Sequence, residues 1–71
     1  MINTTSLRDK IKNRGLKLKH IASTLGLTPY GLSKKIENKT EFKSSEIKKM
    51  SNVLGLTREE TYDIFFADEV D

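Results

Sequence analysis

The sequence contains no cysteine, only one histidine and one proline, and few aromatic side chains. Without cysteine, disulfides and thiolate chemistry are excluded, and His20 alone cannot hold a metal ion. The apolar runs are only a few residues long, which excludes a transmembrane segment or a signal-peptide core. We also find no glycine-rich phosphate loop, no Ser-His-Asp arrangement and no recognisable acid/base pair of carboxylates. We therefore expect a protein that is not an enzyme and that has no metal, cofactor or small-molecule ligand.

Basic residues outnumber acidic residues, and they are concentrated in the first part of the chain. Residues 1–43 hold ten lysines and arginines against three acidic residues, a formal charge of +7, whereas residues 44–71 have a formal charge of −4. A basic half of this kind indicates a polyanionic partner. A solvated lysine-rich surface would have the same composition, so charge alone leaves both interpretations open.

Three glycines divide the chain into segments of helical periodicity. Gly15, Gly26 and Gly55 each follow a stretch with apolar residues at helical spacing, as glycines at helix C-termini do. No stretch alternates with a period of two, so no strand is predicted. With 71 residues there is room for one domain only. The sequence thus predicts an all-α domain over residues 1–71, with five short helices at about 6–14, 18–25, 29–37, 44–54 and 58–66.

Residues typical of helix N-termini indicate where these helices begin. Ser6 with Asp9 three residues later resembles a capping box. Thr28 is expected as an N-cap with Pro29 in the first helical position, where both residue types are favoured. Thr57 with Glu60 is expected to form a capping box at the start of the last helix.

The apolar residues of the expected helices recur at spacings that place them on inward faces. The expected core consists of Leu7, Ile11, Ile21, Ala22, Leu25, Leu32, Ile36, Phe42, Ile47, Met50, Val53, Leu54, Ile64 and one of Phe65 and Phe66. For Tyr62 and the other phenylalanine, a position at the edge of the core and a dimer contact both remain open. The acidic residues 68–71 are expected to fray.

A stretch near the middle of the sequence has the features of two helices that meet at a sharp turn. Ala22 is small where the helices would cross closely, and Gly26 can end the first helix with a positive φ. Leu27 can fill the turn, Thr28 can cap the next helix, and Leu32 can close the contact. Because all of these residues suit the same turn, together they predict it more strongly than any single residue does.

This stretch resembles the helix-turn-helix of the phage repressor and Cro-like regulators, the broad xenobiotic-response-element-type family. The matching residues are Ile21-Ala22, Leu25-Gly26-Leu27-Thr28, Leu32 and Ile36-Glu37. The resemblance continues on both sides and covers the chain from about Ser6 to Phe66. It implies a lambda-repressor-like fold and a sequence-specific transcriptional regulator that binds double-stranded DNA, as a homodimer on a palindromic operator. It also implies a cytoplasmic, nucleoid-associated protein of a bacterial or phage-infected cell.

The resemblance implies roles for individual residues, with the helix at 29–37 in the major groove. The residues expected to contact DNA bases are Thr28, Pro29, Tyr30, Ser33 and Lys34. The residues expected to contact phosphates are Lys17, Lys19, Asn38, Lys39 and Lys43. Lys35 points about 100° away from Lys34, so it is expected at the surface or against the DNA backbone.

Two positions depart from the pattern of the family. Where the family usually has Thr-Gln at the start of the second helix, this chain has Lys17-Leu18. The phosphate contact of that glutamine does not carry over to Leu18, and Lys17 or Lys19 is expected to replace it. Gly31 lies inside the third helix, either as a weak point in it or as a place where the backbone approaches DNA closely.

Other interpretations of the same residues remain open. A polar, solvated helix face would show the same spacing of charges as a DNA-reading face. The alternative function is a protein-interaction module on the same fold, such as an antitoxin or antirepressor. The charge of +7 on residues 1–43 favours DNA.

Overall fold

Five helices and no strand make up residues 1–66, the part of the chain that the computed structural model describes. The helices are α1 (Thr4–Arg14), α2 (Leu18–Leu25), α3 (Pro29–Ile36), α4 (Ser44–Leu54) and α5 (Arg58–Phe65). The predicted all-α fold is therefore confirmed, whereas the fraying expected at 68–71 lies outside the described residues. Within residues 1–66, every helix is too short or too polar to cross a bilayer.

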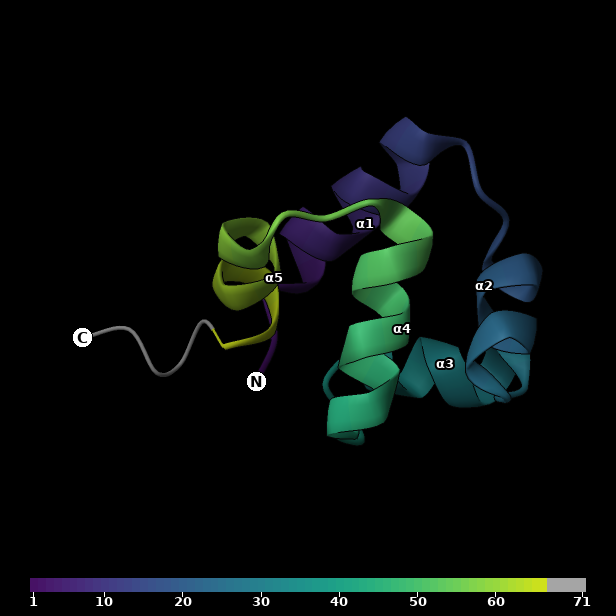
Figure 1. Ribbon diagram of the computed structural model, residues 1–71. Helices are drawn as coiled ribbons and strands as arrows, with labels where there is room; N and C mark the ends of the chain where they lie inside the picture. The colour runs from purple at the N-terminus through teal and green to yellow at the C-terminus, as the bar shows by residue number, and fades with distance from the viewer. Residues whose placement is uncertain (67–71) are drawn as a thin grey trace.

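The helix α4 lies at the centre of the fold, between two groups of helices (Figure 1). α2 packs against α3 and α4 on one side, and α1 and α5 pack against α4 and against each other on the other side. The buried apolar side chains where the helices meet are Leu7, Ile11, Ile21, Ala22, Leu25, Leu32, Ile36, Met50, Leu54, Ile64 and Phe65. All of them belong to the predicted core, and Phe65 is the phenylalanine that occupies it.

The inward face of α4 differs from the prediction. Ile47 and Val53 are only partly buried and pack at the edge of the core. Met50 and Leu54 are buried as predicted, and Glu46 is buried with them, since the three are spaced four residues apart and so lie on one face of the helix. A carboxylate thus takes a place that apolar periodicity alone would not assign to it.

The start of α1 also differs, because Asn3 and not Ser6 is the N-cap. The side chain of Asn3 accepts a hydrogen bond from the N–H of Ser6 at 3.1 Å. The backbone N–H of Asn3 donates to the carbonyl of Ile64 at 2.8 Å, which ties this end of α1 to α5. The capping box predicted at Ser6 and Asp9 is wrong, since Ser6 lies inside the first turn. Asn3 is as good a cap as serine, and its contact with α5 favours the earlier start.

Polar contacts join α5 to α1 and α4. Lys10 of α1 forms an ion pair with Glu60, and the hydroxyls of Ser51 and Thr61 lie 2.7 Å apart. The hydrogen bond from Lys10, with a second one from the backbone N–H of Thr57, lowers the pKa of Glu60 to about 2. The carboxylate of Glu60 is therefore charged throughout the neutral and mildly acidic range.

Candidate nucleic-acid interface

The turn between α2 and α3 is closed by backbone hydrogen bonds around Gly26. Gly26 has a φ of 73°, which glycine adopts without steric cost. Its N–H donates to the carbonyl of Ser23 at 3.1 Å, and the N–H of Leu27 donates to the carbonyl of Ala22 at 2.9 Å. This is the Schellman pattern of a helix end. Ala22 has no exposed surface, so its small size lets the chain turn closely at the predicted place.

The first turn of α3 is capped by Thr28, as predicted. The hydroxyl of Thr28 accepts a hydrogen bond from the N–H of Gly31 at 3.0 Å. A Cβ atom at Gly31 would lie only 3.1 Å from the same hydroxyl oxygen. The absence of a side chain at Gly31 thus leaves room for the cap of the helix, a role that neither sequence-based interpretation of this glycine included.

The outer face of α3 carries an exposed tyrosine and a partly exposed lysine. Leu32 and Ile36 are buried, and Tyr30 and Lys34 lie about 200° around the helix from Leu32. Tyr30 is 74% exposed, and the ammonium of Lys34 lies 5.5 Å from the centre of its ring. Such a cation–π contact orients both side chains on the outer face.

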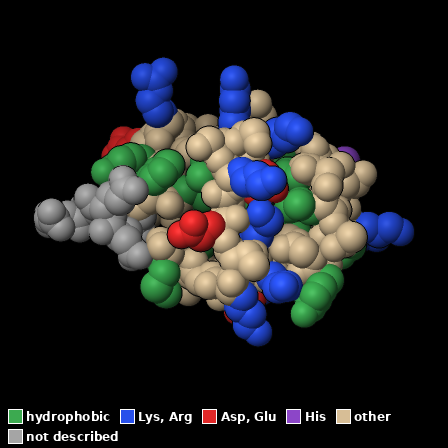
Figure 2. Space-filling model, turned by 90° about the horizontal axis from the view of Figure 1, so that it is seen from below, with side chains coloured by type: hydrophobic (Ala, Val, Ile, Leu, Met, Phe, Trp, Pro, Cys, Tyr) green, Lys and Arg blue, Asp and Glu red, His purple; other side chains and the backbone are tan. Residues whose placement is uncertain are grey.

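The other residues expected to contact bases share this side of the domain. Thr28 and Pro29 are exposed at the start of α3, and Ser33 is partly exposed in its middle. Seen from below, the molecule shows separate lysine and arginine side chains scattered over its surface and acidic side chains at only a few points (Figure 2). The residues predicted to read bases therefore lie together at the start and in the middle of α3.

Four lysines predicted to contact phosphates are exposed on the elements next to α3. Lys17 and Lys19 lie at the start of α2, where Lys17 is the N-cap residue without a side-chain cap bond. Lys39 lies in the loop after α3, and Lys43 is the N-cap residue of α4. One pair thus precedes the turn in the sequence, and the other pair follows α3.

Lys35 has a different role from the one predicted. Its ammonium donates to a carboxylate oxygen of Glu46 at 2.7 Å and to the carbonyl of Glu41 at 3.0 Å. The side chains of Lys35 and Glu46 are only 13% and 9% exposed. The expectation of a surface or DNA-backbone position for Lys35 is therefore wrong, because this lysine forms an ion pair that joins α3 to α4.

The environment of Glu46 keeps its carboxylate charged. Burial raises the pKa of Glu46, but hydrogen bonds from Lys35 and from the backbone N–H of Lys43 outweigh it and lower the pKa overall. The N–H of Lys43 donates to Glu46 at 2.8 Å, which caps the first turn of α4. Glu46 is the third residue of a predicted helix, and this position could have identified it as a capping carboxylate from sequence.

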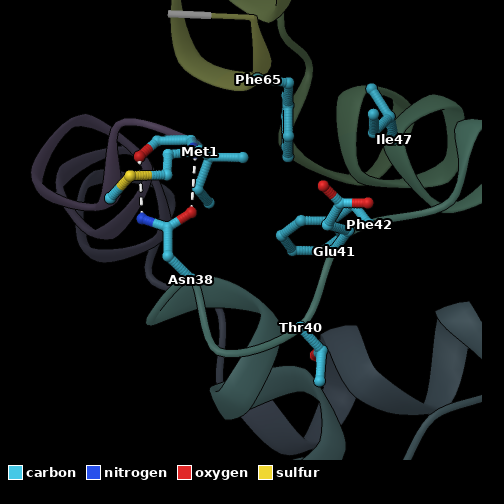
Figure 3. A pocket seen from close by; sticks show the side chains of 8 residues that line it. Met1, Asn38, Thr40, Glu41, Phe42, Ile47 and Phe65 are labelled. Atoms are coloured by element: carbon cyan, nitrogen blue, oxygen red, sulfur yellow. Dashed lines mark hydrogen bonds between the residues drawn. The ribbon is translucent and has the colours of Figure 1, made fainter. Parts of the chain in front are cut away.

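Asn38, expected to contact phosphate, has its side chain turned to the start of the chain. Its amide oxygen accepts from the N–H of Ile2 at 2.7 Å. Its amide nitrogen donates to the carbonyl of Ile2 at 3.0 Å and to the hydroxyl of Thr4 at 3.2 Å. Both amide hydrogens are thus used within the protein, and Figure 3 shows the two hydrogen bonds that join the amide of Asn38 to the start of the chain. The predicted phosphate contact does not agree with this placement of the side chain.

A second surface lies between α4 and α5 and was only partly foreseen. Ile47, Leu56, Tyr62 and Phe66 contribute apolar surface to a groove there, with Lys48 and Arg58 among the other lining residues. Tyr62 is 46% exposed, and its ring centre lies 5.7 Å from that of Phe66. The sequence indicated that Tyr62 and one phenylalanine could remain outside the core, but not that a groove forms beside them.

Comparison with models of known protein families, with curated proteins and with solved structures finds no match for this chain. Within residues 1–66 there is also no group of histidine, cysteine and acidic side chains suited to a metal ion. The functional interpretation therefore rests on the geometry around α3.

Proposed function

We propose that this protein is a sequence-specific, double-stranded DNA-binding transcriptional regulator of the phage repressor or Cro-like type. In this proposal α2 and α3 form a helix-turn-helix, and α3 enters the major groove of the operator. The observation that carries the proposal is the outer face of α3, where exposed Tyr30 and partly exposed Lys34 contact each other and exposed lysines occupy the neighbouring elements. A cytoplasmic, nucleoid-associated protein is part of the same proposal.

Each group on the outer face of α3 suits a feature of the major groove. The ammonium of Lys34 can donate to O6 or N7 of guanine, and the hydroxyl of Ser33 can pair with several bases. The ring of Tyr30 can contact a thymine methyl group. Thr28 and Pro29, at the start of the helix, would lie nearest to the groove edge.

The lysines beside α3 supply the electrostatic part of the proposed interface. Lys17, Lys19, Lys39 and Lys43 would contact phosphates of the DNA backbone. Phosphate contacts of this kind fix the position of the recognition helix but carry no sequence information. Their contribution to affinity falls as salt rises, because binding releases counterions from the DNA.

A homodimer on a palindromic operator belongs to the proposal, since one short helix reads too few base pairs for a unique site. The half-sites would lie about 34 Å, one helical turn, apart or a multiple of it. The groove between α4 and α5, with the exposed ring of Tyr62, is the apolar surface that favours contact between two copies. The same groove is the observation that favours the alternative function, a protein-interaction module on this fold.

The proposal is tested by selecting bound sequences from a random duplex library and then titrating variants on the selected duplex and on a scrambled one. We expect a palindrome, and for Lys34→Ala a loss of about 1–3 kcal/mol on the selected duplex only. Lys39→Ala should weaken both duplexes equally. Lys12→Ala, at an exposed position of α1, serves as the control for loss of one positive charge.

The outcomes test the role of Lys34 and the DNA-binding function separately. Equal losses for Lys34→Ala on both duplexes would remove Lys34 from the base-reading set. No salt-dependent binding to any duplex would contradict the DNA-binding function and leave the protein-interaction module as the better explanation.

A further inference from the structure

Asn38, two residues after the end of α3, takes a backbone conformation that glycine takes after three other helices. Gly15, Gly26 and Gly55 have positive φ at the ends of α1, α2 and α4, and Asn38 has a φ of 64° at the end of α3. The N–H of Lys39 closes the helix end by donating to the carbonyl of Lys34 at 2.9 Å. Glycine would adopt this conformation at lower cost, although asparagine tolerates it. The side chain of Asn38 is therefore expected to have a use of its own.

That use is a clasp made by three residues, Ile2, Thr4 and Asn38. The amide of Asn38 pairs with both backbone groups of Ile2, at 2.7 and 3.0 Å, beside a hollow of about 290 Å³ next to Met1 (Figure 3). The hydroxyl of Thr4 donates to the carbonyl of Ile36 at 2.6 Å. The clasp thus joins the first residue of α1 to the last carbonyl of α3, and the segment before α1 to the first residue after Glu37.

The loop that begins at the clasp is held at a second point as well. The carbonyl of Glu41 accepts from the ammonium of Lys35, which is itself paired with Glu46. Between these two points Lys39 and Thr40 are exposed. The backbone under Lys39 is therefore fixed on both sides, while its side chain points to solvent.

We propose that the clasp positions Lys39 against a DNA phosphate, and that Asn38 and Thr4 are positioning residues which do not themselves contact DNA. This inference rests on the proposed DNA-binding function. A loop that is already ordered loses less conformational entropy when it binds, so its phosphate contact is stronger. Opening the clasp should therefore weaken the Lys39 contact without changing which bases are read.

The decisive variant is Asn38→Gly, because glycine keeps the positive φ but removes the three side-chain hydrogen bonds. We expect it to bind the selected and the scrambled duplex more weakly by the same factor, roughly three- to tenfold. The slope of log K against log salt should become shallower by up to about 0.9, the value for one phosphate contact. Thr4→Val should act in the same direction, whereas Thr4→Ser, which keeps the hydroxyl, should resemble the wild type.

A merely structural role is distinguished by combining the variants. In the proposal, Lys39→Ala costs little further affinity once Asn38→Gly has freed the loop, because both changes remove the same contact. If Lys39→Ala costs as much in the Asn38→Gly background as in the wild type, the proposal is overturned. Should Asn38→Gly fail to fold, the same comparison is made with Thr4→Val, with Thr4→Ser as its matched control.

Hydrogen exchange separates this inference from the proposed function. Exchange of the amide of Lys39, which donates to the carbonyl of Lys34, should be faster in the folded Asn38→Gly variant without DNA than in the wild type. Unchanged exchange would show that the clasp does not order the loop, even if DNA binding is intact. If the wild type binds no duplex, both the proposed function and the DNA role of the clasp are contradicted. Faster exchange in Asn38→Gly would then still show that the clasp orders the loop.

Discussion

Replacing Lys35 with methionine tests the ion pair that holds α3 against α4. Methionine keeps most of the apolar stem of Lys35 but removes the ammonium that contacts Glu46 and the carbonyl of Glu41. The carboxylate of Glu46 would keep its hydrogen bond from the N–H of Lys43 at 2.8 Å but would be left buried without a cation. The variant should therefore be destabilised chiefly by an unpaired charge and only slightly by lost packing.

The size of this effect follows from the burial of the pair. Removing one partner of a buried ion pair costs about 3–5 kcal/mol. The Lys35 side chain is still 13% exposed, which lets water reach the pair, so we expect about 2–3 kcal/mol. A domain of 71 residues has a total stability of roughly 4–11 kcal/mol. The loss is thus large enough to lower the urea midpoint by about 1–3 M.

Urea unfolding followed by circular dichroism measures this effect. Lys49→Met is the matched control, because Lys49 is exposed on α4 and should change the stability by less than about 0.5 kcal/mol. Adding Glu46→Gln to Lys35→Met should restore part of the loss, since a neutral amide needs no cation. A Lys35→Met midpoint equal to that of the wild type would refute the buried pair. The pair would also be refuted if Glu46→Gln destabilised the Lys35→Met variant as much as it destabilises the wild type, because the two changes would then be independent.

Three further predictions concern the turn, the response to acid and the dimer. Ala22→Leu should destabilise the domain by about 1–3 kcal/mol through overpacking, whereas Ser23→Leu on the exposed face of α2 should not. An Ala22→Leu variant with the same thermal melting temperature as Ser23→Leu would contradict this. Because the hydrogen bond from Lys10 holds the pKa of Glu60 at about 2, its stabilisation is present above about pH 4.5 and is lost as the pH falls towards 2. Glu60→Gln should flatten this loss in urea melts between pH 5 and 2, and an unchanged pH dependence would show that the pair contributes nothing. Tyr62→Ser should weaken binding to a two-half-site duplex while leaving a single half-site unaffected, and equal losses on both would remove Tyr62 from the dimer contact.

The helices could be predicted from the sequence because the signals that define them are local. Apolar spacing, glycines at helix ends and threonine caps each act within about one helical turn of their own position. The exception is the start of α1, where Asn3 and Ser6 are both suitable caps. The choice between them depends on the contact of Asn3 with the carbonyl of Ile64, which is distant in sequence and so gives no local signal.

The parts of the candidate site that sequence analysis missed are those whose partners are distant in the chain. Lys35 finds Glu46 across α3 and α4, and Asn38 finds Ile2 over a separation of 36 residues. From composition, a lysine and an asparagine in a basic region look like ligands for phosphate. Only the fold shows that the polar groups of Lys35 and Asn38 already have partners. Tyr30, Ser33 and Lys34, in contrast, could be placed on the outer face of α3 by helical periodicity alone.

Contacts within the fold also reduce the number of positive charges that are available to the proposed interface. Of the ten lysines and arginines in residues 1–43, four have an ion pair or a hydrogen bond within the fold: Arg8, Lys10 and Lys35 form ion pairs, and the guanidinium of Arg14 donates to the carbonyl of Leu54 at 2.8 Å. Lys34 is assigned to bases, which leaves the four predicted phosphate lysines and Lys12 on α1.

Four phosphate contacts correspond to a slope of log K against log salt of about −3.6 for each domain, compared with about −9 if all ten basic residues met phosphates. A half-site titration that gave the steeper value would mean that the ion pairs of Arg8, Lys10 and Lys35 open when DNA binds. The interface proposed around α3 would then be too small. A slope near zero would instead contradict DNA binding through this face.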